Sequence, residues 1–163
     1  MDDMNLFVRQ QLLLMVRALY FCMDRHWAEI GKKHQISPAQ QHILFLLSTH
    51  QNELTPSKIG ELGCWHSSTV TRLLKPLKES GFITIKTSSR FKIVSMTDAG
   101  SRLLEELIET VKQTETFPFD LRHLSEQEVL TFLECGQSIL DVHKGEDFRL
   151  QVLNARVDDC YYG

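Results

Sequence analysis

The sequence predicts a mostly α-helical fold with one small β-hairpin wing, in the order of a winged helix-turn-helix flanked by long helices. Three observations predict it. Apolar residues recur at helical spacing over most of the chain, a glycine turn separates two central helices, and a brief pattern of β-branched residues follows them. The 163 residues are 42% hydrophobic and 24% charged, which is typical of a globular domain and argues against disordered and fibrous classes.

A long helix is predicted over residues 6–30, where apolar side chains recur every three or four positions. The main apolar positions are Leu6, Val8, Leu12, Leu13, Val16, Leu19, Tyr20, Met23, Trp27 and Ile30. Phe7, Leu14, Met15 and Phe21 widen this surface beyond what one small domain would cover. A stripe of this width indicates a second partner surface.

Three shorter helices follow, and each has a recognisable start. Ser37–Pro38 and Thr55–Pro56 each place a capping hydroxyl before a proline, which is favoured at the first helical position. The second of these helices ends at Gly63, a residue that tolerates a left-handed turn. The third must start near His66 or Ser67. Its buried face is predicted from helical spacing as Val70, Leu73, Leu74 and Leu77.

After Gly81 the pattern changes to two brief strands on either side of residues 86–90, KTSSR, which indicates a hairpin. Thr97–Asp98 then caps another helix, which the Phe-Pro-Phe-Asp segment at 117–120 interrupts. A capping box at 125–128 opens the last long helix. We expect its apolar residues to lie inside the protein, namely Val129, Phe132, Leu133, Ile139 and Leu140. Beyond Gly145 the pattern is ambiguous.

The charge is distributed unevenly along the chain, so the formal net charge of -3 does not exclude a nucleic-acid partner. Residues 55–96 hold seven basic and two acidic side chains, a net charge of +5. Residues 1–54 hold five of each sign, and residues 97–163 hold six basic and fourteen acidic side chains, a net charge of -8. The positive segment coincides with the predicted helix-turn-helix and hairpin.

The predicted exposed face of the second helix of that motif carries small hydroxyls and long cations. These residues are Ser67, Ser68, Thr71, Arg72 and Lys75. Such groups bond phosphates and base edges in a major groove, which is wide enough to admit a helix. The competing interpretation is an ordinary helix with a solvated basic face.

Three stretches of this region resemble the MarR family of bacterial winged-helix regulators. They are STVTRLL at 68–74, LKESGFI at 77–83 and MTDAG at 96–100, within a resemblance that covers about residues 37–104. Within the family, GCWHSST at 63–69 is most similar to the Hpr type, regulators of protease production in bacilli.

The resemblance implies a homodimeric transcriptional regulator, with repression expected, that binds a pseudo-palindromic site in double-stranded DNA. It divides the chain into an N-terminal dimerisation helix (1–36), a winged DNA-binding domain (37–100) and C-terminal dimerisation helices (101–163). The residues carried over as DNA contacts are Ser67, Ser68, Thr71 and Arg72, together with Arg90 at the tip of the wing. Lys75 joins them from the charge pattern as a phosphate contact.

Two features depart from the family's pattern. The wing is about three residues shorter than usual and has Ser88 where an acidic residue often orients the arginine, so entry of Arg90 into the minor groove is left open. Pro76 lies inside the recognition helix and removes the hydrogen bond to the carbonyl of Arg72. We expect a kink there, beyond the turns that contact bases.

No catalytic, cofactor or metal site is predicted. His26, His34, His42 and His50 recur every eight residues, but a helix break separates them and this spacing rotates each step by about 80°. No nucleotide-binding or nucleophile motif appears, so we expect no enzymatic activity. The four cysteines, Cys22, Cys64, Cys135 and Cys160, form no C-x-x-C pair and are expected to be buried or idle, with Cys22 packed in an apolar seam.

The chain starts with an acidic segment and shows no apolar run of about 18 residues, so we expect a cytoplasmic protein without a membrane partner. Two other functions stay open at this point. One is a winged module that binds a partner protein through the acidic C-terminal third. The other is a regulator modulated through a thiol such as Cys22 or by an unidentified small-molecule effector, bound where the family keeps an apolar pocket.

Overall fold

The computed structural model describes residues 4–156, which form seven α-helices, one short 3-10 helix and three strands. Helix α1 (Leu6–Gly31) leads through η1 (Lys32–His34) to α2 (Pro38–Ser48). Strand β1 (Glu53–Leu54), α3 (Pro56–Gly63), α4 (Ser67–Glu79), β2 (Ile83–Ser88) and β3 (Phe91–Met96) complete the winged domain. Helices α5 (Asp98–Gln113), α6 (Glu126–Lys144) and α7 (Glu146–Leu153) follow. The predicted fold class is confirmed.

The helix starts are where the sequence predicts them, because each depends on a local hydrogen bond. Ser37 and Ser125 form capping boxes with Gln40 and Glu128. The hydroxyl oxygens of Thr55 and Thr97 accept hydrogen bonds from the backbone amides of Lys58 and Gly100, each at 3.1 Å. Helix α5 ends at Gln113, four residues before the predicted break.

One apolar core holds the winged domain together, and it is formed by α2, α3, α4, the sheet and α5. The most deeply buried members are Ile43, Leu44, Leu46, Leu47, Ile59, Leu62, Val70, Leu77, Ile83 and Val94. Leu103, Leu104 and Leu107 of α5 join the same cluster. The core therefore fixes α4 by its inner face and leaves its outer face free.

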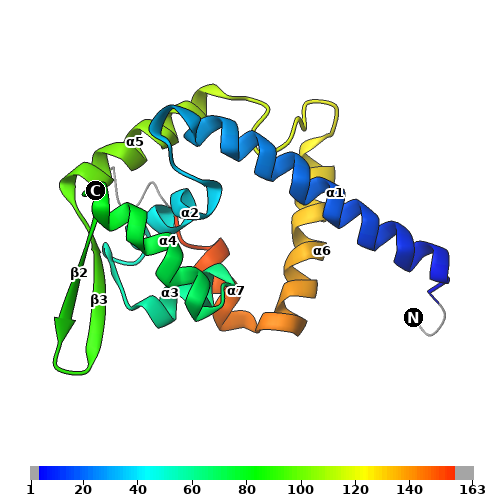
Figure 1. The fold of residues 1–163 in the computed structure, drawn as a ribbon. Helices are drawn as coiled ribbons and strands as arrows, with labels where there is room; N and C mark the ends of the chain where they lie inside the picture. Colours follow the sequence, from blue (N-terminus) through cyan, green and yellow to red (C-terminus); the bar gives the residue numbers. More distant parts are fainter. Residues whose placement is uncertain (1–3, 157–163) are drawn as a thin grey trace.

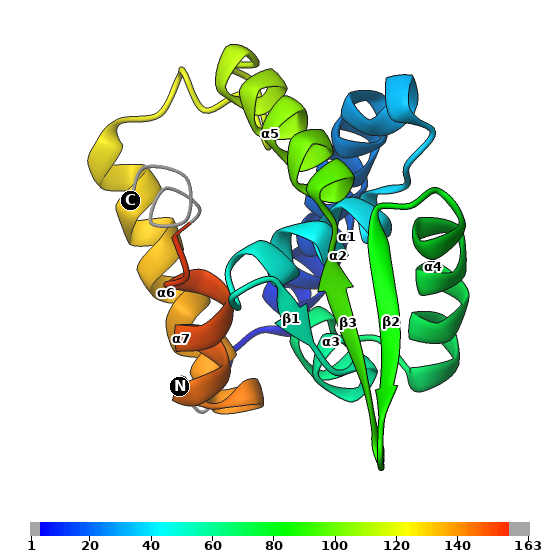
Figure 2. The ribbon, with the colours of Figure 1, turned by 90° about the vertical axis from the view of Figure 1, so that its left-hand side faces the viewer.

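The sheet has one strand more than predicted. Strand β3 lies between β2 and β1, and both of its pairs are antiparallel. Strands β2 and β3 stay paired up to Ser88 and Phe91, so Lys86–Ser88 belongs to the strand and the loop contains only Ser89 and Arg90. The predicted five-residue loop was therefore too long. The resulting hairpin projects beyond the domain (Figures 1 and 2).

The apolar side chains of α1 and α6 lie largely outside this core. In Figure 1, α1 extends from the winged domain, and α6 runs apart from the sheet and leads to α7. Gly31 is the one fully buried residue of α1, whereas Leu13 is 69% exposed. The expectation that the stripe of α6 lies inside was wrong for the single chain, since Phe132 and Ile139 are 58% and 61% exposed. These two helices present a large unpartnered apolar surface.

By length and composition alone, the stretch Leu6–His34 also meets the criteria for a membrane-spanning helix, because a window of 18 residues within it has a mean hydropathy of 1.3. The expectation that no segment does so was wrong, because arginines such as Arg17 do not lower the mean hydropathy of the window enough. None of the apolar window is buried within the single chain. The apolar face of a helix that pairs with another protein surface passes the same test.

Candidate nucleic-acid interface

Helix α4 presents a polar outer face that the turn before it positions. The backbone amide of Trp65 donates a hydrogen bond to the carbonyl oxygen of Gly60 at 2.9 Å, and this bond closes the turn after α3. His66 is the N-cap: its Nδ1 accepts a hydrogen bond from the Ser68 amide at 3.4 Å and lies 3.1 Å from Ser68 Oγ. The start of α4 was correctly predicted, but the capping role of the His66 ring was not.

All six predicted DNA contacts are exposed, namely Ser67, Ser68, Thr71, Arg72, Lys75 and Arg90. The first five share the outer face of α4, opposite the buried Val70 and Leu74. Thr71 Oγ1 donates to the carbonyl of Ser67 at 3.1 Å. Within residues 4–156, neither Arg72 nor Lys75 has an acidic partner, so both charges are available to a ligand.

Helix α4 continues to Glu79, three residues beyond Pro76. The proline lies after Arg72 and Lys75 and has no N–H for the carbonyl of Arg72, but the residues of the polar face before it are helical. The predicted kink stays a prediction.

Arg90 lies in the two-residue turn at the tip of the wing, next to Ser89, whose φ of 39° is in the left-handed region. Lys86 and Lys92 on the flanking strands are also exposed. Phe91, the first residue of β3, is 64% exposed beside Arg90. The tip therefore combines a cation with an exposed aromatic ring. The alternation of apolar and polar residues along so short a strand did not predict this exposure.

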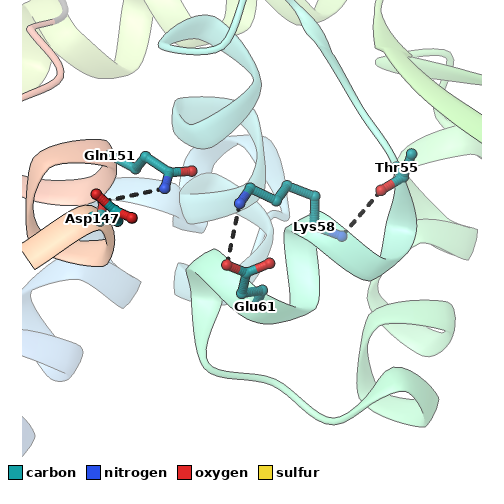
Figure 3. Close-up of polar contacts among 5 residues, drawn as sticks. All are labelled: Thr55, Lys58, Glu61, Asp147 and Gln151. Carbon is teal, nitrogen blue, oxygen red and sulfur yellow. Dashed lines mark hydrogen bonds and ion pairs between the residues drawn. The ribbon is translucent and has the colours of Figure 1, made fainter. Parts of the chain in front are cut away.

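Lys58 contributes less to the positive surface than its position in the basic segment suggested. Its Nζ lies 3.1 Å from Glu61 Oε1 on the same helix. Figure 3 shows this pair on α3 beside α7, where Gln151 Nε2 donates to the carbonyl of Asp147 at 3.1 Å. The free charge is thus concentrated on α4 and the wing.

The turn between α3 and α4 differs from the prediction in one detail. Gly63 is the last helical residue, and Cys64 after it adopts the left-handed conformation with φ 59°. The ring of Trp65 lies where a Cβ on Gly63 would be, so glycine is required there for space. Cys22, Cys64 and Cys135 are exposed, which corrects the expectation of buried thiols in the single chain, and Cys160 lies outside the described residues.

The four evenly spaced histidines serve separate contacts. His26 packs against Phe117, His34 lies 3.5 Å from Glu106, and His50 Nδ1 lies 2.8 Å from the carbonyl of Leu46. His42 packs between two tryptophans. Among the described residues, no group of three or more metal-ligating side chains converges.

A cleft of about 730 Å³ lies between α1 and α5, at the junction where the resemblance implies an effector pocket. Its lining is mostly charged or polar and includes Glu29, Lys33, His34, Glu106 and Glu109. The expected apolar character is not found in this cleft.

The element order, the exposed cationic face of α4 and the projecting hairpin define a winged helix-turn-helix protein. Within that class, residues 36–90 match the model of the MarR family. Regulators named HTH-type transcriptional regulator Hpr, from Bacillus cereus and Bacillus mycoides, are 27% identical over 103 residues, which is 61% of this chain. The chain spans about half (55%) of the length of these curated relatives.

Solved structures agree on the fold. A MarR family protein from Bacillus stearothermophilus has a TM-score of 0.67 at 21% identity, and the match covers 84% of this chain and 96% of that protein. MepR from Staphylococcus aureus, in a complex with DNA, has a TM-score of 0.70 at 23% identity over 79% of this chain and 95% of MepR. The match therefore extends beyond the winged domain to the flanking helices.

Proposed function

We propose that this protein is a transcriptional regulator that binds duplex DNA through α4 and its wing, with repression as the expected mode. The observation that carries the proposal is the outer face of α4, where Arg72 and Lys75 are exposed and unpaired beside three hydroxyl side chains. A cationic helix of this kind fits a major groove. The MepR complex with DNA, which shares the fold, supports the same mode of binding.

The functional unit in this proposal is a homodimer. Helices α1 and α6, in residues 1–36 and 101–163, would dimerise, and residues 37–100 would contact DNA. The exposed apolar side chains of α1 and α6 support this arrangement because a second copy would remove them from water. A helix covered in this way needs no membrane, and a cytoplasmic location follows.

The predicted contact residues fall into three groups in the proposed complex. Ser67, Ser68, Thr71 and Arg72 would contact base edges and nearby phosphates, and Lys75 would contact phosphate. Arg90 would approach the adjacent minor groove from the tip of the wing. The comparisons favour this function over a protein-interaction module, and the relatives are regulators rather than enzymes.

Substitutions on α4 test the proposal on a duplex selected from random DNA. We expect Arg72→Ala to cost roughly 1–3 kcal/mol at a base that it contacts and to relax specificity there. Lys75→Ala should weaken binding to all duplexes alike, and it should reduce the salt dependence of the affinity by the amount expected for about one phosphate contact. Anisotropy titrations against the selected duplex and its single-base variants measure both effects. Unchanged binding in both variants would refute the assignment.

A further inference from the structure

Three aromatic rings connect the long helix α1 to the turn that starts α4. The His42 ring on α2 lies 5.7 Å from the Trp27 ring of α1 and 5.5 Å from the Trp65 ring, measured between centroids. The second pair is nearly perpendicular, at 82°. We call Trp27, His42 and Trp65 the aromatic bridge.

The aromatic bridge is anchored at both ends. The backbone carbonyl of Trp27 accepts a hydrogen bond from Gln41 Nε2 at 3.2 Å, which ties α1 to α2. At the other end, Trp65 directly precedes His66, the N-cap of α4, and its ring lies against Gly63. A displacement of Trp65 therefore moves the first turn of α4, which carries Ser67 and Ser68.

His42 lies in an environment suited only to its neutral form. Its Nε2 is buried and has no hydrogen-bond partner within the described residues, and burial lowers the pKa of the imidazole below its usual value. Helix α2 has no other titratable side chain. On α1, Asp24 is the nearest titratable residue on the same face of the helix as Trp27. Trp65 is flanked in the sequence by Cys64 and His66. None of these shifts the pKa of His42, for which burial is the single cause.

We propose that the aromatic bridge positions the start of α4 and makes DNA binding sensitive to acid, because protonation of His42 releases Trp65 and the turn that it holds. The inference rests on the proposed function as a DNA-binding protein. His42 is a positioning residue in this scheme and does not touch DNA.

The direction of the effect follows from proton linkage. With the bridge closed, His42 binds a proton only below its ordinary pKa of about 6.5, whereas with the bridge open and the ring solvated it titrates near that value. Acid therefore favours the open form as the pH falls below about 6.5. In general, acid strengthens binding to phosphate, because histidine protonation adds positive charge to a protein surface. A loss of affinity in acid would run against that general trend.

The free protein offers a direct measurement, because its only two tryptophans, Trp27 and Trp65, both contact His42. Protonated imidazole quenches indole fluorescence. We expect the emission to change as the pH falls below about 6.5 and to change less in His42→Phe, which keeps a ring at this position but cannot be charged. His42→Gln is the second variant if phenylalanine does not fit, and circular dichroism checks that each variant is folded. An emission that does not respond to pH in the folded wild type would overturn the proposal.

Duplex affinity across the same pH range completes the test. The wild type should lose at most about tenfold in affinity per pH unit for each protomer, the limit for coupled uptake of one proton. His123→Gln, at an exposed loop position, is the matched control and should behave like the wild type. Equal acid sensitivity in His42→Phe, or an emission change without loss of affinity, would overturn the inference while DNA binding stands. No duplex binding even at neutral pH would overturn the proposed function itself, together with this inference.

Discussion

At the scale of single residues, Gly31 determines how α1 meets the winged domain. A Cβ at this position would collide with the backbone oxygen of Ile36 and the side-chain nitrogen of Gln41. Gln41 is itself buried, and its Nε2 donates to the carbonyls of Trp27 and Ile36. The glycine therefore allows the hydrogen bonds that connect α1 to α2.

We expect Gly31→Ala to destabilise the protein by about 1–3 kcal/mol, because the added methyl group forces Gln41 or the backbone to move. Urea unfolding monitored by circular dichroism measures the difference. Gly136→Ala on α6 is the matched control, since a Cβ there meets no atom within 4 Å and alanine favours the helix. Equal stability changes in the two variants would contradict the role assigned to Gly31.

The residues that could be predicted from sequence are those whose role depends on near neighbours. The caps at Ser37, Thr55, Thr97 and Ser125 are local patterns, and the structure has them all. The aromatic bridge could not be predicted, because its rings come from three segments that only the folded chain brings together. The left-handed conformation of Cys64 was not predicted, because Gly63 directly before it is the residue type that usually adopts this conformation.

At the scale of elements, periodicity predicted every long helix and the hairpin, but not β1 or the length of the wing. Strand β1 has two residues and is defined by backbone pairing to Val94 and Ser95, which leaves no hydrophobic pattern. The wing strands extend through polar residues to Ser88 because cross-strand pairing, not burial, holds them. The exposed stripe of α6 was predicted as core because its spacing is that of a buried face.

The apolar face of α1 gives a test of the proposed dimer. We expect Leu13→Glu to dissociate the dimer, since Leu13 is exposed in the single chain and a buried carboxylate in its place would lack a partner. Gln10→Glu adds the same charge at an exposed polar position of the same helix and serves as the control. Sedimentation velocity measures the association state, and circular dichroism checks the fold. A dimer that tolerates both substitutions would place the interface elsewhere.

At the scale of the whole molecule, the distribution of charge matters more than its sum. The net charge of -3 conceals a winged segment of +5 and a C-terminal part of -8. The pairing of Lys58 with Glu61 concentrates the free positive charge further, on α4 and the wing tip. An acidic remainder disfavours contact with phosphate elsewhere on the surface, so in the proposed complex the charge would also orient the protein on DNA.

Binding of a homodimer to duplex DNA is tested most directly by selection of bound duplexes from random DNA, followed by sedimentation of the complex with the enriched sequence. For a dimeric DNA-binding regulator, we expect an inverted repeat with half-sites about one DNA turn apart, roughly 34 Å, and two chains on each duplex. Affinity should fall linearly with salt on logarithmic axes as counterions are released. Recovery of no enriched sequence, or of binding that salt does not weaken, would contradict it.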